Sequence, residues 1–273
     1  MRIALVQVAS PGSESTPERR SRVADLLHAA AGADLIVLPE LWDVGYFAFD
    51  RYGDESQPSA GPTVTALAEV ARALGAFVHV GSFVERTPDG RLRNTAVLLD
   101  RRGQPVLRYS KVHVFGYQSR EAELIQPGDS LDVTGTEFGA LGTTTCYDLR
   151  FPELWRGLVD NGAELAVVPA AWPMARLEHW RLFTAARAVE QQILMIACNA
   201  VGEQGGVELA GHSRVIDPWG QVVVEADSSE GITFCEVDPA VVAAARVAFP
   251  VLRDRLPDYS ALLGGSPIGA TST

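Results

Sequence analysis

Short apolar runs alternate with amphipathic segments along this chain. Residues 3–8, 33–38, 164–168 and 193–199 are almost wholly apolar, which is typical of strands buried on both faces of a sheet. Residues 16–32 carry apolar side chains at the 3.6-residue period of a helix. The same signals predict helices from residue 61 to Gly75, over residues 152–161 and 177–192, and from residue 238 to about residue 247.

Paired strands and turns complete the pattern. Residues 76–84 and 94–100 flank a Pro-Asp-Gly turn and predict a hairpin, as do residues 213–216 and 222–224 around Asp-Pro-Trp-Gly. Further strands are predicted at residues 106–109, 138–146 and 232–237. Residues 42–57 are aromatic and acidic without a clean period, which predicts a loop that rims a site.

The two halves of the chain repeat the same order of elements. Helices alternate with buried strands, which favours an α/β fold. Crossover helices and a late hairpin in each half fit two β-sheets packed face to face with helices outside. No linker or change in composition divides the chain, so we predict one domain over residues 1–263. The small, polar residues 264–273 are expected to form a disordered tail.

Composition narrows the class of partner. The chain has 273 residues, of which 47% are hydrophobic, and a formal net charge of −11, which argues against nucleic acid and anionic membrane surfaces. No apolar run approaches the ~20 residues that a membrane helix requires, and no signal peptide pattern opens the sequence. Three widely spaced cysteines form neither a disulfide framework nor a CxxC metal pair. We therefore expect a reducing, cytoplasmic setting.

Cys146 stands in the segment LGTTTCYDLRFP (141–152), where a β-branched apolar run gives way to a polar turn and a helix that opens at Pro152. Ligands bind at such strand ends in α/β folds. The turn is expected to expose the thiol, and backbone N–H groups are expected to lower its pKa. A buried structural cysteine is the alternative. That alternative suits Cys198 and Cys235, which lie in apolar runs, better than Cys146.

Glu40, Lys111 and Cys146 each end an apolar β segment. Because the carboxyl ends of strands gather the active site in α/β sheets, these residues can converge although they are far apart in sequence. Together they make chemical sense: a thiolate nucleophile, an ammonium that keeps it ionised and stabilises an oxyanion, and a carboxylate that shuttles protons. The alternative for Glu40 and Lys111 is an ordinary solvated position.

Three segments resemble the signature motifs of the nitrilase superfamily of carbon–nitrogen hydrolases. They are LIVLPE (35–40), YSKVHVF (109–115) and TTTCYDLRFPE (143–153). The resemblance continues through PAAWP (169–173), HWRLFTAARAVEQQ (179–192) and GHSRVIDPWG (211–220), so it covers nearly the whole chain. The most similar branch is the Nit-type amidase group, which includes ω-amidases and deaminated-glutathione amidases. The loop HVFGYQSREAELIQPGD (113–129) differs from the HLFD-type loops of ω-amidases.

The resemblance implies a four-layer α-β-β-α sandwich, usually dimerised through helices, that hydrolyses small-molecule amides without metal or organic cofactor. Cys146 would attack the amide carbonyl carbon, Glu40 would act as general base, and Lys111 would stabilise the tetrahedral intermediate. The backbone N–H of Tyr147 would complete the oxyanion hole. Ammonia would leave, and water activated by Glu40 would hydrolyse the thioester.

The family also has a second active-site glutamate. Glu121 matches by its offset from Pro127, and Glu123 is the competitor. Candidates for the pocket wall are Tyr147, Trp172, Arg150 and His179.

Two of the arginines have structural alternatives. For Arg150, an ion pair with Asp148, Glu153 or a dimer partner is as good an interpretation as binding of a substrate carboxylate. Arg187 and Glu190 are spaced to form an intrahelical pair or an interfacial one.

Rival functions make distinct demands on the sequence. A papain-like enzyme would need a histidine beside Cys146, and His113 and His179 lie in site-like segments, but the CGSCW context is missing. A metal hydrolase would need HExxH or clustered ligands, which this sequence does not contain. A non-enzymatic scaffold would have lost one of Glu, Lys and Cys. Among enzymes, amidase leads, followed by N-carbamoyl amino acid hydrolase and nitrilase.

Overall fold

The computed structural model describes residues 1–256 of the chain. The α-helices are Thr16–Leu27 (α1), Tyr52–Glu55 (α2), Pro62–Leu74 (α3), Glu121–Leu124 (α4), Pro152–Asp160 (α5), Leu177–Gln191 (α6) and Ala240–Ala248 (α7). The strands are Arg2–Gln7 (β1), Leu35–Val37 (β2), Phe77–Arg86 (β3), Leu92–Leu99 (β4), Pro105–Ser110 (β5), Val133–Thr136 (β6), Gly139–Thr143 (β7), Leu165–Ala170 (β8), Leu194–Asn199 (β9), Val201–Gln204 (β10), Val207–Ala210 (β11), Arg214–Ile216 (β12), Val222–Glu225 (β13) and Gly231–Glu236 (β14). Single 3-10 turns occupy His28–Ala30 (η1), Phe49–Arg51 (η2), Cys146–Arg150 (η3), Met174–Arg176 (η4) and Val251–Arg253 (η5).

The strands form two mixed six-stranded sheets of matching topology, in the orders β14-β1-β2-β3-β4-β5 and β13-β12-β9-β8-β7-β6. In the first sheet β1, β2 and β3 run parallel, and in the second β7, β8 and β9 do, while the outer strands of both sheets are antiparallel. Because parallel strands end at the same edge, the residues that follow β2 and β7 are carried to the carboxyl edge of their sheets.

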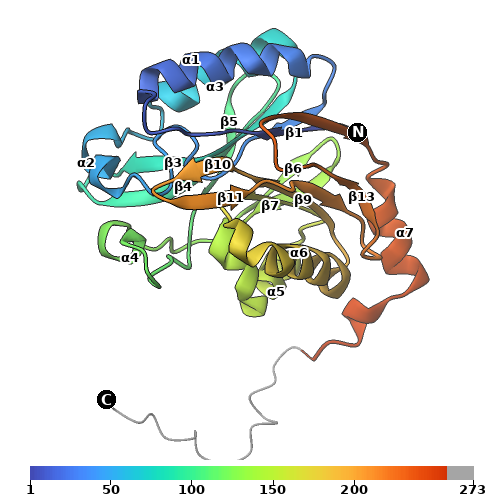
Figure 1. The fold of residues 1–273 in the computed structure, drawn as a ribbon. Helices are drawn as coiled ribbons and strands as arrows, with labels where there is room; N and C mark the ends of the chain where they lie inside the picture. Colours follow the sequence, from blue (N-terminus) through green and yellow to red (C-terminus); the bar gives the residue numbers. More distant parts are fainter. Residues whose placement is uncertain (257–273) are drawn as a thin grey trace, which may run out of the picture.

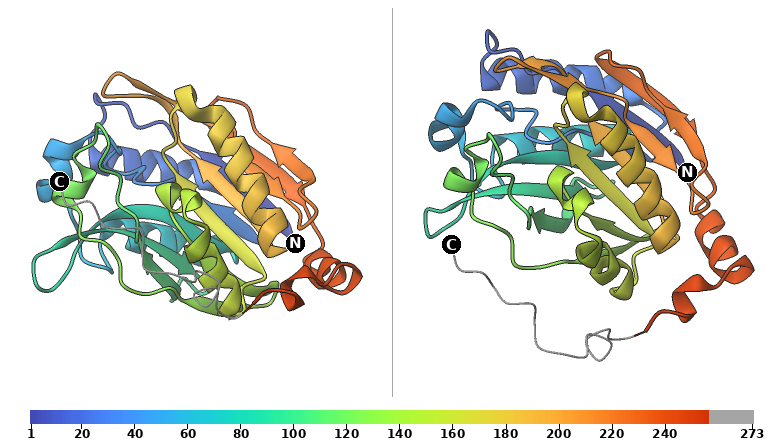
Figure 2. Two further views of the ribbon diagram at one scale, coloured as in Figure 1. Left: turned by 90° about the horizontal axis from the view of Figure 1, so that it is seen from below. Right: turned by 60° about the horizontal axis from the view of Figure 1, so that its bottom comes forward.

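The two sheets pack face to face between two helical layers (Figure 1). Along β1, Ile3 and Leu5 belong to the core between the sheets, whereas Ala4 and Val6 belong to the core under α1 and α3. This alternation buries both faces of the strand and explains its continuous apolar run. Both views of Figure 2 show α5 and α6 side by side over the second sheet. The predicted pair of face-to-face sheets is confirmed.

The predicted helices are present in the structure, and their ends differ slightly from the prediction. Helix α1 begins with a capping box between Ser15 and Glu18, and α3 ends at Gly75 in the left-handed conformation. The helix predicted to reach Gly32 ends as an α-helix at Leu27 and continues as η1. No helix within residues 1–256 is long and apolar enough to cross a membrane.

Several short elements were not predicted. The edge strand β6 and the ribbon of β10 and β11 contain glycine and polar residues, and pairing with neighbours rather than an apolar run holds them extended. The strand predicted over residues 138–146 ends at Thr143, because the chain turns into η3 at Cys146. The predicted loop 42–57 includes η2 and α2. The predicted domain end at residue 263 and the predicted tail 264–273 lie outside the described residues.

Candidate active site

Three buried charged side chains are in direct contact beyond the ends of β2 and β5. The ammonium Nζ of Lys111, the residue after β5, lies 2.9 Å from Oε1 of Glu40 and 2.8 Å from Oε1 of Glu121. All three side chains have no solvent-accessible surface. An ammonium held by two carboxylates has both charge and hydrogen-bond partners, which a buried charge requires. The structure therefore brings Glu40 and Lys111 together, as the sequence predicts.

The structure separates the two candidate second glutamates. Glu121 opens α4, and its Oε2 also accepts hydrogen bonds from the Tyr46 hydroxyl at 3.1 Å and from the backbone N–H of Phe115 at 2.8 Å. Glu123, on the same helix, is exposed and lies 3.6 Å from the Arg120 guanidinium at the surface. Glu121 is therefore the glutamate that belongs to the buried cluster.

Asn94 is a member of this cluster that sequence reasoning missed. Its side-chain Nδ2 donates to Oε1 of Glu40 at 2.8 Å and to Oε1 of Glu121 at 3.1 Å. Oε2 of Glu40 accepts from the backbone N–H of Ala171 at 3.0 Å. With Lys111 and Asn94 both on Oε1, Oε2 is the Glu40 oxygen with more capacity for a further proton. Asn94 lies inside β4, and nothing in the strand pattern marked it.

Two glycines hold the backbone that carries this cluster. A Cβ on Gly81 would lie 2.0 Å from the carbonyl oxygen of Pro39, directly before Glu40. A Cβ on Gly128 would lie 2.0 Å from the carbonyl oxygen of Ser110, directly before Lys111. Neither approach is possible for any other residue type, so both glycines are required by the close packing behind the charged side chains.

Cys146 opens η3 in an unusual backbone conformation. Its φ is +48°, in the left-handed region, and Leu41, next to Glu40, has a φ of +45°. Such conformations are costly for residues with a Cβ and cluster at functional sites. The bend after β7 brings the Cys146 thiol near enough to the Glu40 carboxylate for that charge to raise the pKa of the thiol. The thiol, the ammonium and the two carboxylates thus come from four elements of the chain: η3, the end of β5, the end of β2, and α4.

The expectation of an exposed thiol with a lowered pKa is wrong. Cys146 is only 8% exposed. Burial raises the pKa of its thiol well above the ordinary value, and the Glu40 carboxylate adds to this effect while Lys111 opposes it. The resting group is therefore a thiol. Cys198 is buried, as expected of a structural cysteine, and Cys235 is half-buried.

Asp148 connects the turn at Cys146 with the segment at Lys111. Its buried carboxylate accepts hydrogen bonds from the Thr145 N–H at 3.0 Å and the His113 N–H at 2.9 Å, and it bonds the His113 ring at 2.8 Å. The imidazole also stacks on Phe151 with ring centroids 3.6 Å apart. The His113 ring is therefore engaged by Asp148.

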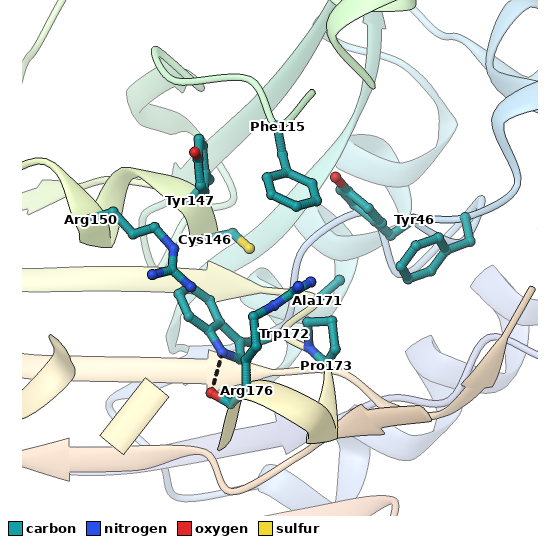
Figure 3. A pocket seen from close by; sticks show the side chains of 10 residues that line it. Tyr46, Phe115, Cys146, Tyr147, Arg150, Ala171, Trp172, Pro173 and Arg176 are labelled. Atoms are coloured by element: carbon teal, nitrogen blue, oxygen red, sulfur yellow. Dashed lines mark hydrogen bonds between the residues drawn. The ribbon is translucent and has the colours of Figure 1, made fainter. Parts of the chain in front are cut away.

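Cys146 faces a small pocket whose wall is mostly aromatic (Figure 3). The pocket is small and open to solvent at its mouth, and the space within it is about 370 Å³ with that solvent included. Tyr46 and Phe47 come from the loop that was predicted to rim a site. The other lining residues are Phe115, Tyr147, Arg150, Ala171, Trp172, Pro173 and Arg176.

Three of the four predicted wall residues, Tyr147, Trp172 and Arg150, line the pocket. His179 instead lies behind Arg150, with its Nδ1 3.3 Å from the guanidinium. The suggested ion pairs of Arg150 with Asp148 or Glu153 are not formed within residues 1–256.

Two further features bear on the earlier alternatives. Arg187 and Glu190 form an intrahelical ion pair at 2.6 Å in α6. Among the described residues, no group of three or more His, Cys, Asp and Glu side chains is arranged to hold a metal ion.

Comparison with known proteins agrees with this geometry. The model of the carbon-nitrogen hydrolase family matches residues 2–247. The chain belongs to the carbon–nitrogen hydrolase family. A 2-oxoglutaramate amidase of Paenarthrobacter nicotinovorans is 38% identical to it, over 98% of this chain and 94% of that protein.

Solved structures similar to this carbon–nitrogen hydrolase share its fold. Nit3 of Saccharomyces cerevisiae, a member of branch 10 of the nitrilase superfamily, has a TM-score of 0.85 and 29% identity over 94% of this chain and 97% of that chain. An amidase from Nesterenkonia sp. AN1 has a TM-score of 0.78 and 27% identity over 94% of this chain and 97% of that chain. In that structure, of a Glu-to-Gln variant, the acetamide moiety of fluoroacetamide is covalently added at the active-site cysteine. The predicted superfamily, α-β-β-α fold and enzyme class are confirmed.

Proposed function

We propose that this carbon–nitrogen hydrolase is an amidase that converts the ω-monoamide of a short dicarboxylic acid into the dicarboxylate and ammonia. The observation that carries the proposal is the buried Glu40–Lys111 ion pair beside the Cys146 thiol, at the base of a small pocket. The name of the 2-oxoglutaramate amidase, whose sequence this chain matches over nearly its whole length, supports the substrate class.

In the first half of the reaction, Cys146 is the nucleophile and Glu40 the general base. Sγ attacks the amide carbonyl carbon while the thiol proton passes to Oε2 of Glu40. The charge that develops on the carbonyl oxygen is stabilised by Lys111 and by the backbone N–H of Tyr147, which has no earlier intrahelical acceptor because Tyr147 is the second residue of η3. The C–N bond then breaks, and the proton on Glu40 goes to the leaving nitrogen, which departs as ammonia.

In the second half, Glu40 removes a proton from water, which attacks the thioester carbon. The C–S bond breaks, the proton on Glu40 returns to Sγ, and the product leaves as a carboxylic acid that releases its own proton to water. Glu121 and Asn94 do not take part in bond making; they hold Lys111 and Glu40 in position through the contacts of 2.8 Å and 2.8 Å described above. Trp172 and the ring of Tyr147 form the pocket wall.

The test is ammonia release from a panel of amides. The panel contains ω-monoamides of dicarboxylic acids, an N-carbamoyl amino acid, a simple aliphatic amide and a nitrile. Cys146→Ala is the blank, and Cys198→Ala, which removes a buried thiol outside the pocket, is the matched control. We expect wild type and Cys198→Ala to release ammonia fastest from the ω-monoamides, with a thioester visible by mass spectrometry. Turnover by Cys146→Ala would contradict the nucleophile assignment, and preference for the carbamoyl compound would change the substrate class.

The protein is also proposed to be a homodimer. Leu182 and Val189 on α6 are 62% and 46% exposed, which is unusual for large apolar side chains and is explained by burial against a second copy. Light scattering after size-exclusion chromatography should give twice the chain mass. Leu182→Glu should shift it toward the monomer, whereas a monomeric wild type would contradict the proposal.

A reducing, cytoplasmic compartment remains part of the proposal. All three cysteines lie in the described part of the chain and are free thiols. Cell fractionation tests the location, and recovery with a secreted fraction would contradict it.

A further inference from the structure

Asn199 is a fully buried polar side chain that the proposed mechanism does not use. It is the last residue of β9 and pairs with Ala170, the last residue of the parallel strand β8. Beyond this pair, residues 171–173 leave the sheet and form part of the pocket wall beside Cys146 (Figure 3). Backbone polar groups that leave a sheet inside a protein need other hydrogen-bond partners.

The side-chain amide of Asn199 replaces a neighbouring strand as the partner of Trp172. Its Oδ1 accepts a hydrogen bond from the backbone N–H of Trp172 at 2.7 Å, and its Nδ2 donates to the Trp172 carbonyl at 3.2 Å. Nδ2 also donates to the carbonyl of Gly211 at 2.8 Å. A carboxamide has the acceptor and the two donors that this arrangement needs, whereas an ionised carboxylate has no donor. Asn199 therefore fixes the backbone of the pocket wall from behind.

The backbone that Asn199 holds is bonded to Glu40 at two places. The backbone N–H of Glu40 donates to the Ala170 carbonyl at 3.3 Å. The backbone N–H of Ala171 donates to Oε2 of the Glu40 side chain at 3.0 Å. Two consecutive N–H groups, those of Ala171 and Trp172, thus donate to the Glu40 carboxylate and to the Asn199 amide. A change at Asn199 is therefore transmitted to the carboxylate through one peptide group.

The Ala171 N–H acts on both groups that exchange the proton in the proposed attack. Lys111 and Asn94 both donate to Oε1 of Glu40, so the Ala171 N–H is the donor that orients Oε2. A hydrogen bond donated to a carboxylate stabilises its ionised form. Burial raises the pKa of the Cys146 thiol, and the same N–H opposes part of that rise.

We propose that Asn199 is a positioning residue for the reaction: it orients residues 170–172 so that the Ala171 N–H holds Oε2 of Glu40 where it receives the thiol proton. This inference rests on the proposed function, because Oε2 is the proton acceptor in that mechanism. Asn199 does not itself line the pocket, so it acts through the backbone. Its replacement should therefore change the behaviour of the general base and not only the stability of the fold.

The decisive variant removes the Ala171 N–H alone. Replacement of Ala171 with L-lactate, by suppression of an amber codon in cell-free translation, changes this N–H to an oxygen and keeps the methyl side chain. Asn199→Ser removes the buried amide that holds the segment. The matched control is Gln192→Ser, which removes another buried side-chain amide, bonded to the Phe249 carbonyl at 2.7 Å near the other end of β9.

We expect the fall of kcat/KM at acid pH to move to higher pH by about 1 unit in the lactate-containing protein and in Asn199→Ser. Glu40 must be ionised in the proposed mechanism, and the loss of a donor to its carboxylate raises its pKa. At the pH optimum, kcat should fall by about 10-fold and KM should stay within a factor of about 3, because a misplaced base impairs proton transfer and not binding. Gln192→Ser should unfold at lower denaturant concentration and keep the wild-type pH profile.

Alkylation of Cys146 by iodoacetamide gives a readout that does not depend on amide turnover. Mass spectrometry of the Cys146 peptide measures its rate, whose pH dependence should shift in the same direction. A wild-type pH profile in the lactate-containing protein, or an equal shift in Gln192→Ser, would overturn the inference and leave the amidase proposal intact. Absence of Cys146-dependent ammonia from every amide would overturn the proposed function, and the alkylation profile would still decide the role of Asn199.

Discussion

The carboxylate of Asp148 accepts a 2.6 Å hydrogen bond from the hydroxyl of Tyr109. Tyr109 stands two residues before Lys111, and Asp148 stands two residues after Cys146. This bond and those from His113 and Thr145 therefore join the segment that carries the ammonium to the turn that carries the thiol. The two groups are held relative to each other by a buried carboxylate that does not itself face the pocket.

Replacing Asp148 with Asn should harm both stability and activity. An amide has one acceptor oxygen in place of two, so part of the hydrogen-bond set is lost and donors are left buried without partners. We expect the free energy of unfolding to fall by at least about 2 kcal/mol, and kcat/KM to fall with it. Denaturant unfolding and ammonia release measure the two effects. Tyr109→Phe, which removes one hydroxyl, should cost about 1 kcal/mol; an Asp148→Asn protein as stable as Tyr109→Phe would contradict this account.

Glu121 and Glu123 offer a matched comparison two residues apart. Glu121→Gln removes a charge in contact with buried Lys111, so we expect kcat/KM to fall by about 10²-fold or more, as for the loss of a group that supports oxyanion stabilisation. Glu123→Gln removes an exposed charge and should stay within a factor of about 2 of wild type. Steady-state kinetics on one ω-monoamide is sufficient. Similar losses in the two variants would show that the buried cluster does not set the rate.

The fall of kcat/KM at acid pH should follow the protonation of Glu40. Burial raises the pKa of Glu40 above 4.5, Lys111 opposes this, and the Glu121 charge adds to it, because two carboxylates share one ammonium. In the proposed mechanism Glu40 must be ionised to accept the thiol proton, so kcat/KM should fall as the pH drops through that raised pKa. In Glu121→Gln the remaining activity should show this fall at lower pH. A fall that does not move would mean that another group controls it.

Deprotonation of Lys111 should cause no fall in kcat/KM just above neutral pH. Although burial lowers the pKa of Lys111, the carboxylates of Glu121 and Glu40 raise it well above 10.5. The ammonium is thus charged throughout the neutral range. A loss of kcat/KM between pH 8 and pH 9 that disappears in Lys111→Arg would contradict this expectation.

Gly81→Ala tests the packing behind Glu40, and Gly90→Ala is its control. Both glycines have positive φ, +70° and +84°, but a Cβ at Gly90 meets nothing within 4 Å. Gly90→Ala should therefore cost only the backbone strain, about 1 kcal/mol. Gly81→Ala adds a collision with the Pro39 carbonyl and should destabilise the protein further and reduce kcat/KM by displacing Glu40. Thermal unfolding and kinetics of the two variants give the comparison, and equal stability would argue against the collision.

The sequence predicted the layers better than the site. Continuous apolar runs marked the central strands, because burial on both faces leaves no polar positions. Glu40 and Lys111 could be identified because each follows a strand pattern, whereas Glu121 was identified only through the family resemblance. Asn94 and Arg176 could not, since Asn94 lies inside a strand and Arg176 lies in a single 3-10 turn, and only the folded chain shows what they face. The pKa of the Cys146 thiol was predicted in the wrong direction, because burial in a packed site outweighs the effect of backbone N–H groups.

The left-handed backbone conformation at Cys146 favours glycine for stability, whereas the proposed reaction requires a thiol there. At φ +48° a glycine would be less strained than cysteine, because glycine has no Cβ to crowd the neighbouring carbonyl. Cys146→Gly is therefore expected to be a more stable protein than Cys146→Ala, although both lack the thiol. A sequence optimised for folding stability alone would have glycine in place of cysteine at position 146. At this one position the thiol that the proposed reaction requires and the residue that the backbone favours are different.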